Sequence, residues 1–399
     1  MRSLRVSRRA VRLPESGSSF MPEGLVAMKI VELKKGIESV DILLLDSLVP
    51  EAKAWLETRH SVAYRPDLAN DLIALRREAY KTRGILFPRS TVVQNELLGF
   101  LPKLCAIARL HVGTDNTDLD ACKERGIKVI HASSANVRSN AEYLLACLLL
   151  LYRRGIVSSL VGRQQPSVQV GRELYGSTVA FLGLAPTAHT LAGMLHGLGA
   201  RLIGYDPAVH HTAPIWARLN IQPVTLTELV SSADAVSVQM LYASRFKYFI
   251  GSKLLAACKR HQLWVGISRS ELFDTDALAA ALKDGRIEAC VLDGAEASFV
   301  AAGSPLHGLK NLFITPRLGS NTREAKLRAS WYVAHRLHEA IAAQHSNFGQ
   351  LPHSAPMDFE LPGAGAGAAR RRGDPLDSGY SPTERALLSG EHDSDFSPR

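Results

Sequence analysis

The segment that most constrains the fold runs from Thr178 to Pro207. A strand-like run, TVAFLGL, leads into a turn at Gly183, a helix-like run follows, and a second strand-like run ends at Asp206. A strand, a glycine turn, a helix and a second strand in this order are typical of a doubly wound parallel sheet. The free N–H groups at the start of such a helix bind the pyrophosphate of a dinucleotide. The sequence therefore predicts a dinucleotide site at this turn.

The turn departs from the usual G-x-G-x-x-G pattern at its second glycine. Gly183 supplies the first glycine, Ala185 replaces the second, and Ala188 is an accepted variant of the third. Pro186 has no N–H and so removes one donor to the pyrophosphate, whereas Thr187 offers a hydroxyl. These five residues are predicted to form the cofactor turn in modified form.

Asp206 is predicted to decide which dinucleotide binds. It ends the run LIGYDP, where the acid that holds the adenosine ribose diol is expected. A carboxylate at this place repels a 2′-phosphate, so NAD is favoured over NADP as the cofactor.

Strand-like and helix-like runs alternate over most of the chain. Strands are expected at 41–46, 61–66, 84–90, 104–110 and 127–133, with helices between them at 49–60, 67–80, 92–102 and 116–126. One long helix is expected at 139–160, the alternation resumes over 178–314, and an amphipathic helix covers 322–344. This alternation predicts an α/β protein with two parallel sheets covered by helices.

Composition narrows the class of protein further. The net charge of +9 comes largely from arginines near the two ends, and no aromatic residues interleave with them, so nucleic-acid binding is not expected. Five widely spaced cysteines without a C-x-x-C motif argue for free thiols, for a cytoplasmic location and against a metal site. The most apolar stretch, at 143–152, is too short to span a bilayer.

Several ordered segments resemble the D-2-hydroxyacid dehydrogenase family, which includes phosphoglycerate dehydrogenase and D-lactate dehydrogenase. The segments are HVGTDNTDLDACKERGIKVIHA, NAEYLLACLLLLYRR, LYGSTVAFLGLAPTA and LKDGRIEACVLDGAE. The resemblance covers about residues 40–345. It implies two doubly wound domains, one flavodoxin-like and one dinucleotide-binding, with the second inserted in the first.

The resemblance also divides the chain and suggests its assembly. It implies a substrate domain beginning at 38–138, an NAD-binding domain at 139–315 and a return helix at 316–345. Outside it, the sequence predicts a poorly ordered extension at 1–37 and, from its Pro/Gly/Ala/Ser-rich composition, a disordered tail at 346–399. Family members are typically dimers or tetramers, so a homodimer through the helix at 140–155 is expected.

The family reaction moves a hydride between NAD and the carbon of a small 2-hydroxy or 2-keto acid. Its arginine matches Arg269, which is expected to bind the substrate carboxylate. Its proton-transferring histidine position holds Arg317, which cannot exchange a proton near neutral pH but can stabilise an oxyanion. Its glutamate position holds Ser298. His111, at the start of the first matched segment, is the candidate proton donor.

The remaining site residues also follow from the resemblance. Val112 and Gly113 are expected to face the substrate carboxylate, whereas Gln239 and Asp293 are expected to line the cofactor. Gln239 itself replaces a family histidine. Arg269 and Arg317 together suit a doubly charged acid, such as a phosphorylated acid like 3-phosphoglycerate.

Two functions remain open at this point. One is an NAD-dependent oxidoreductase of the family. The alternative is a catalytically impaired member that binds NAD or a metabolite as a sensor, a scaffold or a corepressor-like interaction protein. The altered histidine and glutamate positions leave the enzyme activity uncertain.

Overall fold

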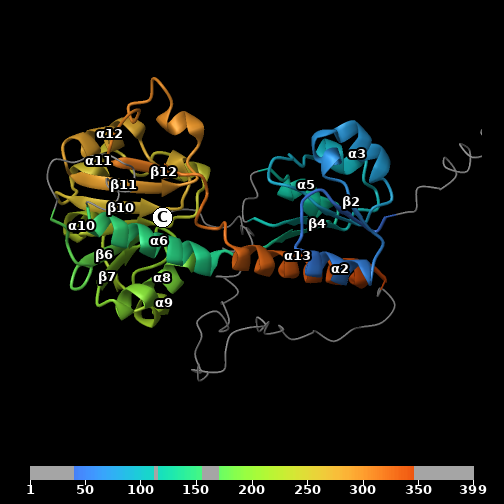
Figure 1. The fold of residues 1–399 in the computed structure, drawn as a ribbon, viewed down its shortest axis with the longest axis horizontal. Helices are drawn as coiled ribbons and strands as arrows, with labels where there is room; N and C mark the ends of the chain where they lie inside the picture. Colours follow the sequence, from blue (N-terminus) through green and yellow to red (C-terminus); the bar gives the residue numbers. More distant parts are fainter. Residues whose placement is uncertain (1–39, 112–115, 155–169, 346–399) are drawn as a thin grey trace, which may run out of the picture.

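The structure, a computed structural model, describes residues 40–111, 116–154 and 170–345. Within these residues the chain forms two lobes, each built around one sheet (Figure 1). All paired strands are parallel, which confirms the expected α/β class. The extension and the tail that the sequence predicts lie outside the described residues.

The first sheet has five strands in the order β2-β1-β3-β4-β5. Its strands are β1 (Ile42–Leu44), β2 (Val62–Tyr64), β3 (Gly84–Leu86), β4 (Ala106–Arg109) and β5 (Lys128–His131). Its helices are α2 (Pro50–Glu57), η1 (Pro66–Asn70), α3 (Leu72–Glu78), α4 (Asn95–Gly99) and α5 (Leu119–Glu124). The inner strands are buried on both faces, as is usual in parallel sheets.

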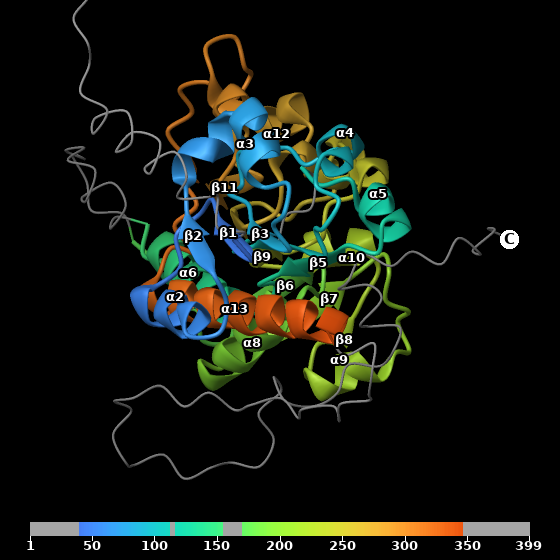
Figure 2. The ribbon, with the colours of Figure 1, turned by 90° about the vertical axis from the view of Figure 1, so that its right-hand side faces the viewer.

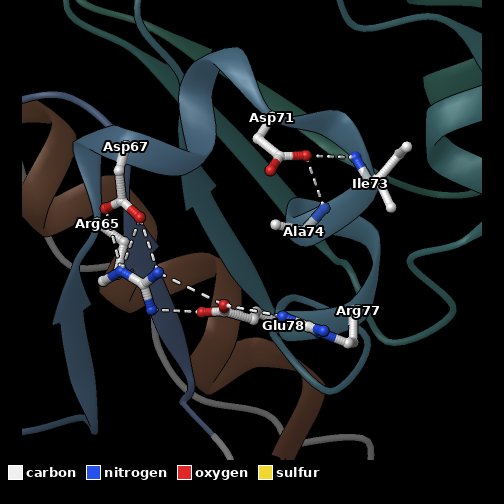
Figure 3. A network of polar contacts seen from close by, with 7 residues as sticks. All are labelled: Arg65, Asp67, Asp71, Ile73, Ala74, Arg77 and Glu78. Carbon is white, nitrogen blue, oxygen red and sulfur yellow. Dashed lines mark hydrogen bonds and ion pairs between the residues drawn. The ribbon is translucent and has the colours of Figure 1, made fainter. Parts of the chain in front are cut away.

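One expected helix of the first lobe is broken. The sequence predicts a single helix over 67–80, but the chain forms η1 and α3 with Asp71 between them. The Asp71 side chain accepts hydrogen bonds from the N–H groups of Ile73 and Ala74, so it caps a new helix (Figure 3). Around this point Arg65 pairs with Asp67 and Glu78 and so fastens β2 to α3.

The second sheet has seven strands in the order β12-β11-β10-β9-β6-β7-β8. Its strands are β6 (Thr178–Leu182), β7 (Arg201–Tyr205), β8 (Gln222–Pro223), β9 (Ala235–Val238), β10 (Gln262–Gly266), β11 (Ile287–Asp293) and β12 (Leu312–Thr315). Its helices are α8 (Pro186–Gly197), α9 (Pro214–Arg218), α10 (Leu226–Ser232), η2 (Ser244–Phe246), α11 (Ser252–Ala256), η3 (Ser270–Leu272), α12 (Thr275–Lys283) and η4 (Ala297–Val300). The strand order reverses at β6, and ligands of such sheets bind where the order reverses.

Two long helices connect the lobes. Helix α6 (Val137–Tyr152) packs against the second sheet, whereas α13 (Arg323–His345) packs against α2 and the first sheet (Figures 1 and 2). Val333 and Leu337 of α13 are fully buried in the core of the first lobe. The last helix therefore returns to the lobe in which the described chain begins.

Helix α6 is shorter than the sequence predicts. It begins at Val137 and ends at Tyr152, so the expected range of 139–160 is wrong at its C-terminal end. Arg154 has a φ of +39°, and this left-handed backbone stops the helix. The segment that follows, 155–169, lies outside the described residues.

Candidate cofactor and substrate site

The first glycine of the turn is required by its surroundings. Gly183 has a φ of +98° and directly follows β6. Because β6 and β9 end side by side, a Cβ at this position would lie 2.5 Å from the backbone nitrogen of Met240. No other residue fits here, so the sharp bend that opens a cofactor turn is present.

The missing second glycine leaves the backbone unstrained. Ala185 has a φ of −56°, which any residue adopts, and Pro186 occupies the first position of α8, where proline is favoured. Ala188 is fully buried and its N–H donates to the Ala185 carbonyl at 2.7 Å. Thr187 is also buried, and its N–H makes no hydrogen bond with the described part of the chain. That N–H is one donor that this turn retains for a pyrophosphate.

Asp206 joins the turn to the next strand. Its Oδ2 accepts a hydrogen bond from the Leu184 N–H at 2.7 Å, and its Oδ1 accepts one from the Ala208 N–H at 2.8 Å. Each carboxylate oxygen accepts more than one hydrogen bond, so both keep capacity for the two ribose hydroxyls. Gly183, the Thr187 N–H and Asp206 therefore fit an NAD molecule.

The other two predicted cofactor residues face inward. Gln239, only 2 % exposed, follows β9, and its Nε2 donates to the Ser237 hydroxyl at 3.0 Å. Its Oε1 has no partner among the described residues. Asp293 ends β11 and binds the segment Thr315–Gly319 through both carboxylate oxygens.

Arg269, the predicted carboxylate clamp, is already paired. It follows β10, and its guanidinium contacts the Glu271 carboxylate at 2.5 Å and lies 5.2 Å from the ring centroid of Tyr242. The hydrogen bond from Arg269 holds the pKa of Glu271 below its usual value. This local pair offsets the charge that Arg269 presents to a substrate.

Arg317 is exposed and held in an unusual backbone conformation. Its φ of +57° lies in the left-handed region that favours glycine. Its side chain lies over Gly294, where an added Cβ would come within 2.6 Å of the Arg317 Cγ. Contact between the segment that carries Gly294 and the segment that carries Arg317 therefore sets the position of the guanidinium.

His111 faces several cationic groups. Burial lowers the pKa of His111 to about 4, with further contributions from Arg89, Arg109, His131 and Arg317. Arg317 follows β12 of the second lobe, so His111 at the end of β4 lies near a residue of that lobe. Val112 and Gly113, the predicted substrate residues next to His111, lie outside the described residues.

The glutamate position lacks a carboxylate, but another glutamate lies close by. Ser298 is exposed in η4. Glu296, two positions earlier, accepts a hydrogen bond from the Ser270 hydroxyl, next to Arg269. The two acidic side chains of this region, Glu271 and Glu296, are therefore both engaged by the segment that carries Arg269.

Sequence reasoning missed Arg109. This arginine is fully buried at the end of β4 and donates to the Thr117 hydroxyl and to the carbonyls of Pro88, Thr91 and Asn116, at 2.9–3.0 Å. The only signal in the sequence is one arginine inside the apolar run LCAIARL. It joins the segments that follow β3 and β4, close to His111.

Two hollows lie elsewhere on the first lobe. One, of about 420 Å³, is lined by Val92, Val93, Gln94, Asn95, Glu96, Asn116, Thr117 and Asp118. The other, of about 370 Å³, lies beside the Arg65 pairs and is lined by Val40, Leu43, Ala63, Arg65, Arg77, Glu78 and Thr82. Neither hollow contains a predicted site residue.

No group of side chains that could hold a metal ion occurs in the described ranges, and none of the helices described there is long and apolar enough to cross a membrane.

The two parallel sheets and the turn at Gly183 define a dinucleotide-binding protein of two α/β lobes. Residues 149–319 match the sequence model of the D-isomer specific 2-hydroxyacid dehydrogenase, NAD binding domain. An (S)-sulfolactate dehydrogenase of Chromohalobacter salexigens is 31 % identical over 307 residues, which are 76 % of this chain and 99 % of that relative. The chain belongs to the D-isomer specific 2-hydroxyacid dehydrogenase family, and its cofactor is NAD.

Other relatives agree with this assignment. A D-3-phosphoglycerate dehydrogenase of Mycobacterium tuberculosis is 33 % identical over 308 residues, which are 76 % of this chain but only 57 % of that protein. The D-lactate dehydrogenase from Aquifex aeolicus, solved with NAD and lactic acid, shares the fold with a TM-score of 0.64 and 21 % identity, over 77 % of this chain and 97 % of that one. The expectation of an NAD-dependent oxidoreductase of this family is thereby confirmed.

Proposed function

We propose that this protein oxidises a small 2-hydroxy acid carrying a second negative group, such as a sulfonate, a phosphate or a second carboxylate. The observation that carries the proposal is the positive charge of the arginines near His111. Among the described residues, Arg89, Arg109 and Arg317 each lower the pKa of His111 by their positive charge. A site with a positive potential attracts anions.

The charge of the site favours a doubly charged acid over a singly charged one. Arg269 is offset by Glu271, whereas Arg317 has no carboxylate within ion-pair distance in the described part of the chain. The exposed Arg317 is therefore available to bind one negative end of a substrate, and Arg269 is the candidate for the other. The names of two relatives, a sulfolactate and a phosphoglycerate dehydrogenase, specify acids with two anionic groups.

The residues divide the chemistry as follows. NAD supplies the acceptor for the hydride, and Gly183, the Thr187 N–H and Asp206 would hold it. Arg317 stabilises the negative charge that develops on the substrate oxygen but does not exchange a proton. His111, whose pKa burial lowers to about 4, is the group that would accept the proton of the substrate hydroxyl. A bound dianion offsets the surrounding cations and makes His111 a stronger base.

The test combines binding and turnover. Calorimetric titration with NAD and NADH is followed by initial rates with sulfolactate, 3-phosphoglycerate and malate, and with lactate as the singly charged control. We expect kcat/KM to be at least about tenfold higher for one of the dianions, which corresponds to about 1.4 kcal/mol. Equal rates for lactate would overturn the dianion proposal. NADH binding without turnover of any acid would instead support a non-catalytic sensor.

We further propose that the protein forms a homodimer through α6. Leu149 lies on the outer side of this helix and is 42 % exposed, between the exposed Ala146 and Arg153. Light scattering of wild type and Leu149→Asp tests this, because a charge at the centre of an apolar contact dissociates the dimer. A wild-type monomer, or a variant that stays dimeric, would contradict the proposed contact.

A further inference from the structure

Asp293 holds the short segment that carries Arg317. Its Oδ1 accepts hydrogen bonds from the Thr315 hydroxyl at 2.6 Å and from the Leu318 N–H at 2.7 Å. Its Oδ2 accepts one from the Gly319 N–H at 2.9 Å. Three donors on both sides of Arg317 thus converge on one carboxylate that is only 9 % exposed.

Helix α6 supports the same segment from a second side. The Tyr143 and Thr315 hydroxyls share a hydrogen bond of 2.6 Å, so Thr315 links Tyr143 to Asp293. Gly319 packs so closely that an added Cβ would lie 2.9 Å from Asn140 Oδ1 and 3.1 Å from Asp293 Oδ2. The segment therefore has little freedom at either end.

These contacts explain how Arg317 keeps a left-handed backbone. The Arg317 N–H donates to the Thr315 carbonyl at 3.0 Å, and the same carbonyl accepts the Gly294 N–H at 2.7 Å. A non-glycine residue with a φ of +57° persists only where its neighbours fix the loop. Since the side chain also lies over Gly294, a shift of this loop moves the guanidinium.

We infer that Asp293, with Thr315 and Tyr143, is a positioning residue that sets where the Arg317 guanidinium meets the substrate. This inference rests on the proposed function, in which Arg317 binds and stabilises the anionic substrate. The positioning role differs from a cofactor role for Asp293, because in it Asp293 acts on the substrate through Arg317 and does not contact NAD.

Thr315 offers the sharpest test because it touches Asp293 without being a predicted cofactor residue. Thr315→Val removes the hydroxyl at nearly constant volume, whereas Thr315→Ser keeps it and is the matched control. With NAD and 3-phosphoglycerate, we expect Thr315→Val to raise KM about tenfold or more, with a smaller change in kcat and an unchanged Kd for NADH. Thr315→Ser is expected to restore the KM.

A double-mutant cycle separates positioning from general damage. In an Arg317→Ala background, Thr315→Val is expected to change KM less than twofold, because the group that it positions is absent. An equal effect in both backgrounds would overturn the inference, as would a wild-type KM in Thr315→Val. Asp293→Asn is run in parallel, and a large loss of NADH affinity in that variant would assign Asp293 to the cofactor instead.

A third measurement does not depend on turnover. The rate at which phenylglyoxal modifies Arg317, followed by peptide mass spectrometry, reports the surroundings of its guanidinium directly. We expect this rate to change at least threefold in Thr315→Val, while the rate at the exposed Arg201 stays constant. If the wild type oxidises no acid but the modification rate of Arg317 still changes in Thr315→Val, the proposed function fails while the positioning of Arg317 by Asp293 and Thr315 is supported. An unchanged rate would overturn the positioning.

Discussion

The N–H of Leu184 donates a hydrogen bond to Oδ2 of Asp206 over 2.7 Å. This contact ties the start of the cofactor turn to the end of β7, so the acid expected to bind the ribose also stabilises the turn. One carboxylate therefore serves both the fold and the cofactor.

The first prediction separates these two roles of Asp206. Asp206→Ala leaves the Leu184 N–H without its partner and should lower the free energy of unfolding by about 1–3 kcal/mol. Asp206→Asn keeps an acceptor oxygen and should lower it less. Both variants should bind NAD about tenfold or more weakly, measured by calorimetry beside urea unfolding. Unchanged NAD affinity in Asp206→Ala would show that Asp206 does not bind the ribose.

The second prediction concerns the altered glycine turn. Because Ala185 has a φ of −56°, Ala185→Gly relieves no strain and should cost about 0.4–1 kcal/mol through the more flexible unfolded chain. Pro186→Ala restores an N–H at the start of α8 and should bind NADH about tenfold or more tightly, because a hydrogen bond to a charged group contributes about 1.5–3 kcal/mol. NADH titration of both variants checks this. Weaker binding by Pro186→Ala would mean that proline preorganises the turn.

The sequence predicted the architecture because its signals are local. Apolar runs, glycine turns and helical periodicity specified the alternation, and the last helix was expected within one residue of its observed bounds, Arg323–His345. The end of α6 was missed because the left-handed backbone at Arg154 leaves no mark in an apolar, helix-favouring run.

The site was less predictable because its pairings join distant segments. No motif indicates that Glu271 offsets Arg269, that Asp293 holds the segment around Arg317, or that the only arginine in β4 is buried. These relations depend on the lengths of loops and on which strand ends meet, and a single sequence does not contain that information.

The third prediction is a pH dependence caused by His111. In the unfolded chain His111 takes up a proton with the ordinary pKa of 6.5, whereas in the folded protein its pKa is about 4. Between these values the unfolded state holds more protons, so folding stability falls as the pH falls from 6.5 towards 4. Above pH 6.5 both states are neutral and His111 has no such effect.

His111→Gln isolates this contribution because it leaves His131 in place, whose pKa is lowered by burial in the same direction. Guanidinium unfolding at pH 7.5, 5.5 and 4.5 should show the variant losing less stability than the wild type as the pH falls. Parallel losses at all three pH values would mean that His111 titrates normally in the folded protein.

The fourth prediction is that Arg109 supports the substrate loops through its hydrogen bonds. Arg109→Met fills a similar volume but leaves three carbonyls, those of Pro88, Thr91 and Asn116, without their donor. Since each hydrogen bond to a charged group contributes about 1.5–3 kcal/mol, the free energy of unfolding should fall by at least about 3 kcal/mol.

Two further variants show whether geometry or charge accounts for that loss. Arg109→Lys keeps the positive charge, but a compact ammonium cannot reach acceptors spread around a planar guanidinium, so it should recover less than half of the loss. Lys103→Ala, at an exposed position before the same strand, should change stability by less than about 0.5 kcal/mol. Full recovery by lysine in urea unfolding would show that the buried charge, rather than the set of hydrogen bonds, is what the loops require.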